Sequence, residues 1–305
     1  MPLTHERNFR VRHYECDPYG HLNNTNYLRY MQETAFDAST AAGYDPARYQ
    51  SMDRTWLVRE TDIEYFQPAR YNDQLTVKTW VLDFWRVHSR RAYAFHRAGT
   101  SELLARAVTD WAFLEQSTGR PVSIPNEVAV AYFPAGEVVE GSRRKRIPAA
   151  PRPPAGTFSH QRRVAWRDLD ANAHVNNAAY IEFAEDCGVE VAAAFGWPMA
   201  RCMEAGFAIL VRRHQILYRH PAFLGDDLDV KTWISDIQRV KAIRHYTITR
   251  VSSGQQLARL RSTYVWVDLA SGKPIRIPEI FIRDFEANIV RNARASLPTD
   301  KPPMD

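Results

Sequence analysis

The sequence predicts an α+β protein built from two tandem copies of one domain, each with a long helix packed against a meander of antiparallel strands. The chain matches itself without a gap at an offset of 153 residues, as for Asp17 and Asp170 (170 − 17 = 153). Each copy also holds one stretch of helical periodicity followed by stretches of strand-like alternation. Because solenoid units span only about 20–50 residues, a repeat this long indicates whole domains.

The repeat extends over nearly the whole chain. It includes two identical stretches, which are Leu57-Val58-Arg59 with Leu210-Val211-Arg212 and Val77-Lys78-Thr79-Trp80 with Val230-Lys231-Thr232-Trp233. We expect an N-terminal domain at 1–130, a proline-rich basic linker at 131–160, a C-terminal domain at 161–290 and a tail at 291–305. The copies should form one pseudo-twofold unit with their sheets joined edge to edge, because such pairing covers an open sheet edge.

Within the first copy, a short strand at Phe9–Tyr14 should lead to a polar turn and then to a helix at about Thr25–Ala42. Apolar residues recur there every three or four positions, Asn23 or Asn24 suits the N-cap, and Gly43 suits the position just past the helix. The second copy repeats this pattern up to Gly196. Strands should follow at about 75–82, 92–96 and 103–114, with a hairpin turn at Ser117–Arg120.

Composition excludes several classes of protein. Hydrophobic residues make up 45% of the 305 residues and charged residues 25%, which is typical of a folded globular chain. No apolar run approaches the ~20 residues of a membrane helix and no signal peptide precedes the first domain, so we expect a cytoplasmic protein that does not bind membranes. Three cysteines without a C-x-x-C spacing predict no disulfide framework and no zinc or redox motif. The net charge of +5 suits an anionic ligand without indicating nucleic acid.

The turn before each helix keeps the same polar residues in both copies. Asp17 and His21 precede the first helix, Asp170 and His174 precede the second, and each pair is followed by Asn-Asn. A helix N-terminus offers unpaired N–H groups that can hold an oxyanion, and a nearby carboxylate can act as base or nucleophile. An aspartate before a helix is often only a cap, but recurrence at identical spacing favours catalysis of acyl transfer or hydrolysis.

At these residues the chain resembles a known family. The run from Asp17 through His21-Leu22-Asn23-Asn24 is similar to the hot-dog acyl-CoA thioesterases of the 4-hydroxybenzoyl-CoA type. The run from Asp168 to Asn177 resembles the acyl-carrier-protein (acyl-ACP) thioesterases of plants and bacteria. The resemblance covers both repeats and implies two hot-dog domains, each a long helix wrapped by a curved antiparallel sheet, with the thioester bound at the interface between them.

The resemblance also implies roles for single residues. Asp170 would attack the thioester or activate water while Asn172 and His174 orient it, and Asp17 and His21 would serve in the first copy. Tyr19 replaces the asparagine there, so we expect Asp170 to carry more of the chemistry, although either site or both can be active. The plant enzymes also have an acidic residue and a cysteine that Tyr218–Ala222 lacks, which leaves the nucleophile open. The substrate would be bound at Gly20, Asn23, Asn24, Ala173, Asn176 and Asn177.

The predicted function is hydrolysis of acyl-ACP or acyl-CoA to a free acid and a thiol, as in fatty-acid and other lipid metabolism, with no metal or other cofactor. A hot-dog hydratase or dehydratase and a non-catalytic acyl-CoA binding module are the alternatives. We expect no nucleic-acid partner and leave open a homodimer of the tandem chain. The basic run Arg143–Arg146 is interpreted as a solvated linker, with contact to nucleotide phosphates or to an acidic carrier protein as the alternative. The helical carboxylates Glu33, Glu185 and Asp186 are interpreted as a solvated face, and the alternative is that one of them is buried toward the interface and assists the site.

Overall fold

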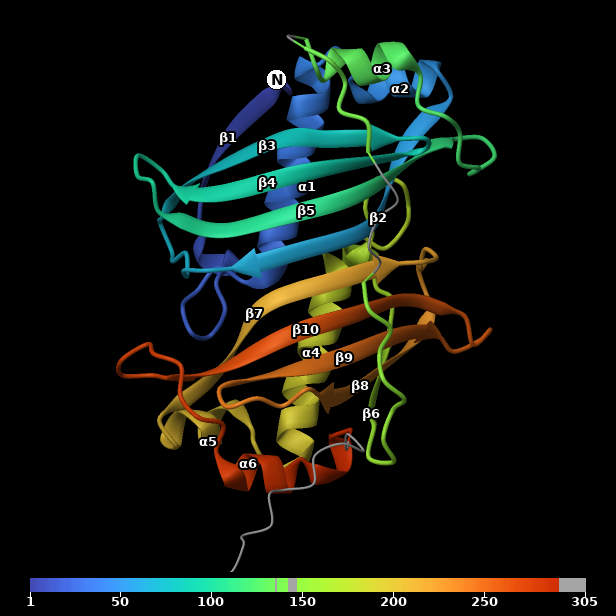
Figure 1. Ribbon diagram of the computed structural model, residues 1–305. Coiled ribbons are helices and arrows are strands. Elements are labelled where there is room, and N and C mark those ends of the chain that lie inside the picture. Colours follow the sequence, from blue (N-terminus) through green and yellow to red (C-terminus); the bar gives the residue numbers. More distant parts are fainter. Residues whose placement is uncertain (135, 142–146, 291–305) are drawn as a thin grey trace, which may run out of the picture.

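The structure is a computed structural model that describes residues 1–134, 136–141 and 147–290 (Figure 1). The basic run Arg143–Arg146 and the expected tail therefore lie outside the described residues. The first half contains β1 (Thr4–Arg10), η1 (His13–Glu15), α1 (Asn24–Ala41), α2 (Pro46–Ser51), β2 (Arg54–Tyr65), β3 (Gln74–Trp85), β4 (His88–Arg97), β5 (Leu103–Glu115) and α3 (Asn126–Ala131). The second half contains β6 (Phe158–Arg163), η2 (Trp166–Asp168), α4 (Ala179–Ala194), α5 (Met199–Glu204), β7 (Phe207–Tyr218), β8 (Asp227–Ser235), β9 (Lys241–Arg250), β10 (Gln256–Asp268), α6 (Glu279–Asp284) and η3 (Glu286–Asn288).

All named strands join in one antiparallel sheet with the order β1-β3-β4-β5-β2-β7-β10-β9-β8-β6. The two halves meet where Glu60–Glu64 of β2 pairs with Arg213–Leu217 of β7 through five residue pairs. The prediction of an α+β protein with sheets joined edge to edge is confirmed. The repeat is equally regular in the fold, because β2 and β7 begin and end 153 residues apart (207 − 54 and 218 − 65), as do β4 and β9.

The long helices α1 and α4 lie on the same face of the sheet, and their N-terminal turns meet at the middle of the molecule (Figure 1). There Asn24 Nδ2 donates to Glu185 Oε1 at 2.8 Å, and Arg29 Nη2 donates to Glu182 Oε1 at 2.7 Å. Asn23 is the N-cap of α1, since its side chain accepts from Thr25 N at 2.9 Å. Among the described residues, no helix has both the length and the apolar character needed to cross a membrane.

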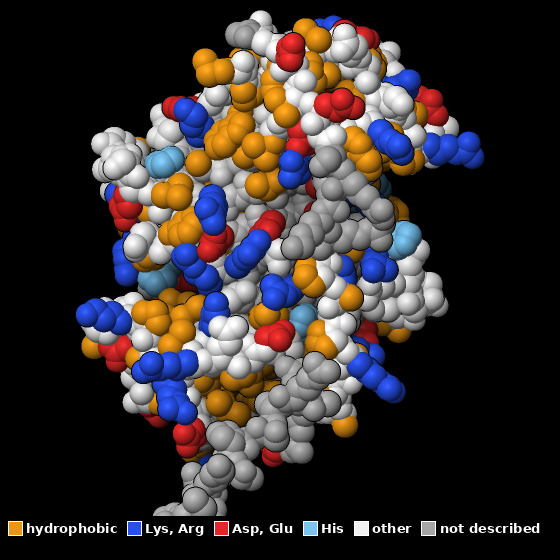
Figure 2. Space-filling view, in the orientation of Figure 1, with side chains coloured by type: hydrophobic (Ala, Val, Ile, Leu, Met, Phe, Trp, Pro, Cys, Tyr) orange, Lys and Arg blue, Asp and Glu red, His pale blue; other side chains and the backbone are white. Residues whose placement is uncertain are grey.

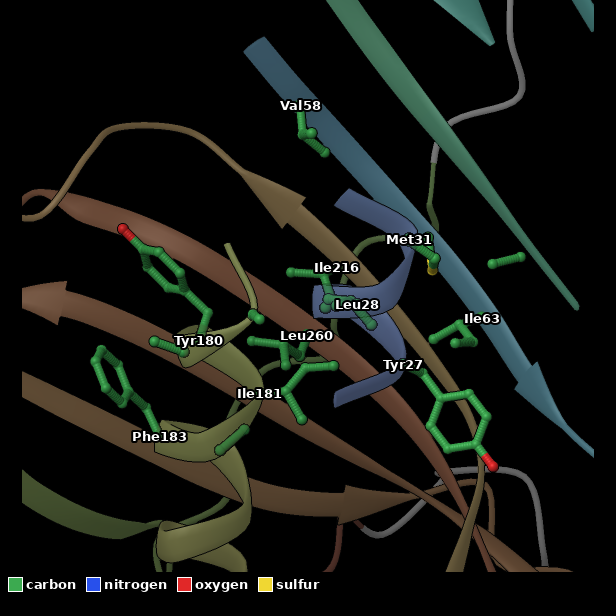
Figure 3. Close-up of a cluster of buried hydrophobic side chains, with 14 of the residues drawn as sticks. Tyr27, Leu28, Met31, Val58, Ile63, Tyr180, Ile181, Phe183, Ile216 and Leu260 are labelled. Carbon is green, nitrogen blue, oxygen red and sulfur yellow. The ribbon is translucent and has the colours of Figure 1, made fainter. Parts of the chain in front are cut away.

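One buried cluster of apolar side chains spans both halves (Figure 3). Tyr27, Leu28 and Met31 project from α1 toward β2 and β7, and Ile181 of α4 and Ile216 of β7 lie close by in the same view. Removing this surface from water stabilises the joined form, since each fully buried Leu or Ile side chain contributes ~1.5–3 kcal/mol. The halves therefore share one core, which holds the N-terminal ends of the two helices at fixed positions.

The outer face of the sheet is polar at the junction. Figure 2 shows Lys and Arg side chains gathered across the middle of this face, with acidic side chains among them. Arg213 Nε donates to Asp62 Oδ1 at 2.7 Å, and an Arg212 guanidinium nitrogen lies 3.2 Å from Glu64 Oε1. These cross-half pairs fix the register of β2 against β7.

One local prediction is wrong. The strand expected at Phe9–Tyr14 lies earlier, because the buried Glu15 carboxylate accepts from Arg12 N at 2.8 Å and from Tyr30 Oη at 2.7 Å and so closes a turn. The turn expected at Ser117–Arg120 is present, since Glu115 N donates to Arg120 O at 2.9 Å and Leu114 faces Pro121 in an antiparallel bridge.

Candidate active site

Two cavities lie against the central helices, and each combines the aspartate turn of one half with the helix of the other half. The first has a volume of about 400 Å³ and holds Asp17 opposite Glu182 and Glu185 of α4. The second has a volume of about 570 Å³ and holds Asp170 opposite Gln32 of α1. Each candidate site is thus completed across the interface, in line with the position that the sequence resemblance implies.

In the first cavity the backbone of the turn holds the Asp17 carboxyl group in place. Its Oδ1 accepts from Tyr19 N and from His21 N, each at 2.9 Å. Burial raises the pKa of Asp17 and the nearby charge of Glu185 raises it further, against the two amide hydrogen bonds, which lower it. A carboxylate with a raised pKa is a stronger proton acceptor at neutral pH than an ordinary aspartate.

Glu185 lies at the first site, so the solvated position preferred for it from the sequence is wrong and the alternative of a carboxylate facing the interface holds. Its side chain is 21% exposed, lines the first cavity and accepts the hydrogen bond from Asn24 Nδ2. Its Oε1 lies 3.9 Å from Nε2 of the fully buried His214. The sequence did contain an indication, because Glu185 lies one turn after the apolar Ile181 on the same side of its helix. Glu33 and Asp186 are exposed as expected.

The start of α1 supplies a free donor beside Asp17. Asn24 is the first residue of α1 and lines the first cavity, and its backbone N–H makes no hydrogen bond to any described residue. Asn23, in the same wall, uses its side chain as the cap. In the second half the backbone N–H of Asn177 is likewise without an acceptor among the residues described. Such an N–H, at the positive end of a helix, suits a developing oxyanion.

The second site is built around Asp170 in the same way. Asp170 Oδ1 accepts from Asn172 N at 2.8 Å, and both residues line the second cavity, where Asn172 is exposed. Ala173 takes a left-handed conformation with φ of 58°, at the position that Gly20 occupies with φ of 74° in the first turn. This conformation costs an L-residue ~1–2 kcal/mol, so the second turn holds local strain.

The remaining predicted residues lie beside the cavities rather than in their walls. The ring of His174 packs edge-on against Phe223 at a centroid distance of 5.2 Å. Burial lowers the pKa of His21, which favours a neutral imidazole at pH 7. Asn176 accepts from Ala178 N at 2.9 Å and so organises the turn before α4. The structure thus brings Asp17, Asn23 and Asn24 together in the wall of the first cavity, and Asp170 and Asn172 together in the wall of the second cavity.

Comparison with known proteins agrees with this architecture. The family model of the thioesterase-like superfamily matches residues 11–132 and 164–285. An acyl-[acyl-carrier-protein] hydrolase of the chloroplast from Cuphea viscosissima is 29% identical over 190 residues, which cover 59% of this chain and 46% of the relative. The dodecanoyl-[acyl-carrier-protein] hydrolase of Umbellularia californica is 24% identical, over 59% of this chain and 49% of its own length. The chain therefore spans about half the length of the curated relatives it matches.

Solved structures show the fold. A candidate oleoyl thioesterase from Lactobacillus plantarum aligns with a TM-score of 0.75 and 20% identity, over 87% of this chain and 96% of that one. The 12:0-ACP thioesterase from Umbellularia californica aligns with a TM-score of 0.68 and 20% identity, over 86% and 94%. The predicted tandem hot-dog fold is confirmed. Since the family model matches both halves, the chain belongs to the thioesterase-like superfamily and carries two copies of its domain.

Proposed function

We propose that this chain hydrolyses acyl thioesters, carried on an acyl carrier protein or on coenzyme A, at the two composite sites. The observation that carries the proposal is that Asp17 and Asn24, whose backbone N–H has no acceptor among the described residues, line the same largely apolar cavity. The names of the curated relatives, which are acyl-ACP hydrolases, support the same reaction.

The chemistry requires a proton acceptor, an oxyanion donor and a place for the acyl group. Asp17 accepts a proton from water while the water oxygen bonds to the thioester carbonyl carbon, and the Asn24 N–H holds the oxygen that becomes negative. The tetrahedral intermediate then breaks its C–S bond, and the leaving thiolate takes the proton from Asp17. A free acid and a thiol result, and the carboxylate is regenerated.

The acyl group would lie along α4, away from the aspartate. The apolar part of the wall includes Val189 and Ala192 of α4, Ile209 of β7 and Phe281 of α6. Apolar walls favour an acyl chain because they replace its contact with water. The second site follows the same plan, with Asp170 as acceptor, Asn172 beside it, His174 supporting the turn, and the acyl group along α1.

The two sites differ in a way that ranks them. Sequence resemblance favours Asp170, whose turn has the fuller set of polar residues. Burial and the nearby Glu185 carboxylate, which both raise the pKa of Asp17, favour Asp17. We propose Asp17 as the stronger base and Asp170 as a second active carboxylate.

The test is steady-state release of free thiol from a panel of acyl-CoAs and acyl-ACPs of increasing chain length. Thiol release reports hydrolysis, whereas a hydratase changes the enoyl absorbance without releasing thiol and a binding module does neither. The Asp17→Asn, Asp170→Asn double variant is the matched control. Thiol release at the same rate by the double variant would mean that hydrolysis does not depend on these sites. Each site is completed within one chain, so the proposed chemistry does not require a homodimer. Whether the tandem chain forms one stays a prediction, which sedimentation velocity can test.

A further inference from the structure

Each cavity has in its wall one buried arginine that has no carboxylate partner among the described residues. Arg91 on β4 and Arg244 on β9 are equivalent in the repeat (244 − 91 = 153) and are 7% and 8% exposed. Arg90, the neighbour of Arg91 with a 42% exposed side chain, does have a carboxylate partner in Asp83. On β4 the exposed Arg90 is thus paired with a carboxylate, whereas the buried Arg91 has none among the residues that the structure describes.

The polar contacts of the two buried guanidinium groups are neutral and long. Arg91 Nη1 donates to Thr79 Oγ1 at 3.5 Å. Arg244 Nη1 donates to Thr232 Oγ1 and to Asn288 Oδ1, both at 3.4 Å. Within the described part of the chain, the other two nitrogens of each guanidinium have no acceptor and no carboxylate lies within 4.0 Å. Several N–H donors of each group are thus available to a ligand.

Aromatic rings keep both guanidinium groups in place. The Arg91 guanidinium carbon lies 5.4 Å from the ring centroid of Tyr132, and that of Arg244 lies 5.5 Å from the ring centroid of Phe285. A cation above an aromatic ring is attracted to it, but this attraction does not replace the lost hydration of a buried charge. A group arranged in this way is ready to bind an anion that enters the cavity.

We propose that the acyl groups taken by these cavities carry a second carboxylate, which pairs with Arg91 in one cavity and with Arg244 in the other. This inference rests on the proposed function and names its substrate class. The planar guanidinium matches a carboxylate through two parallel hydrogen bonds, and an acyl chain ending in hydrocarbon would leave the buried charge unpaired. Along α4 the first cavity runs from Glu185 to Ala192, which is about 10 Å at 1.5 Å per residue and leaves room for a short chain between the two polar ends.

The experiment compares matched pairs of CoA thioesters that differ only in the second carboxylate: adipoyl- with hexanoyl-CoA, suberoyl- with octanoyl-CoA, and sebacoyl- with decanoyl-CoA. The measured quantity is the ratio of kcat/KM within each pair, for the parent chain and for Arg91→Met, Arg244→Met and their double variant. We expect the parent to favour the carboxylated member at least tenfold and the double variant to lose that preference by 10- to 100-fold. Arg120→Met, at an exposed turn outside both cavities, should leave the ratio unchanged.

Binding of free suberate and octanoate, measured by calorimetry, separates this inference from the proposed function. Thiol release without any preference for the carboxylated member overturns the inference and leaves the hydrolase proposal standing. Suberate binding that the Arg→Met variants abolish, without hydrolysis of any thioester, supports the inference and removes the hydrolase proposal. If the double variant does not fold, Arg91→Lys and Arg244→Lys serve instead. Lysine keeps the charge but cannot donate two parallel hydrogen bonds to one carboxylate. An unchanged kcat/KM ratio in both lysine variants would therefore also overturn the inference.

Discussion

Replacing Asp17 by asparagine separates the chemical role of the carboxylate from its role in the turn. An asparagine side-chain oxygen can still accept from Tyr19 N and His21 N, which the Asp17 carboxylate now does at 2.9 Å. The turn should therefore persist. What the variant loses is the negative charge and the ability to accept a proton.

The size of the effect follows from these two losses. A positioned general base contributes about 10²–10⁴-fold in rate, or ~3–5 kcal/mol of activation free energy. The folding stability of Asp17→Asn, in contrast to its rate, should not fall. Burial raises the pKa of Asp17, so the folded state binds the proton more tightly than the unfolded state and loses stability as pH rises from the ordinary aspartate pKa to the folded one. Asp17→Asn removes that loss, and its melting temperature at pH 7 should equal or exceed that of the parent.

The assay is thiol release across pH 4–9, together with thermal unfolding at pH 4 and pH 7. The parent should lose activity on the acid side with an apparent pKa above the ordinary aspartate value, and Asp17→Asn should lack that acid limb. Asp170→Asn is the matched control at the same place in the repeat, and the activity left in each single variant measures the other site. If Asp17→Asn keeps the parent rate while Asp170→Asn abolishes it, our ranking of the sites is refuted. If the double variant keeps the parent rate, the mechanism is refuted.

Three further results are expected. Glu185→Gln should shift the acid limb of the pH–rate profile to lower pH, because the Glu185 charge raises the pKa of Asp17; Glu182→Gln is the control, and a shift of equal size there would contradict this. Ala173→Gly should raise the free energy of unfolding in urea by about 1 kcal/mol, because Ala173 has a φ of 58°; a destabilised variant would show that the turn is unstrained. Burial lowers the pKa of His245 to about 4, so up to ~3 kcal/mol of stability should be lost as pH falls from 6.5 to 4, and His245→Gln should flatten that loss.

Local chemistry accounts for what could be predicted from the sequence. The 153-residue offset indicated two copies of one domain, and the same offset separates β4 from β9. The cap at Asn23 and the left-handed Gly43, with φ of 80°, mark the ends of α1 within one residue of the expected helix. The helix ends depend on residues close together in the chain, since they are set by the hydrogen bonds of a single turn.

The junction strands were beyond such reasoning. The strands expected from the sequence begin only at about residue 75, and the run Arg54–Tyr65, with charges at Glu60, Asp62 and Glu64, is not among them. In the structure these acidic residues line the outer face while Ile63 between them is buried, and Asp62 finds its partner in Arg213 of the other half. Because Arg213 lies 151 residues from Asp62 in the chain, the sequence around Asp62 does not indicate this partner.

The composition of the sites shows the same division. An aspartate turn before each long helix could be predicted from the sequence, because a turn and a helix cap are local structures. The fold is needed to see that Asp17 shares a cavity with Glu185 of the opposite helix, and that Arg91 and Arg244 line the cavities with no carboxylate partner in the part of the chain that the structure describes. Burial and charge at these positions arise from packing between the two halves, which depends on the shapes of surfaces far apart in the chain.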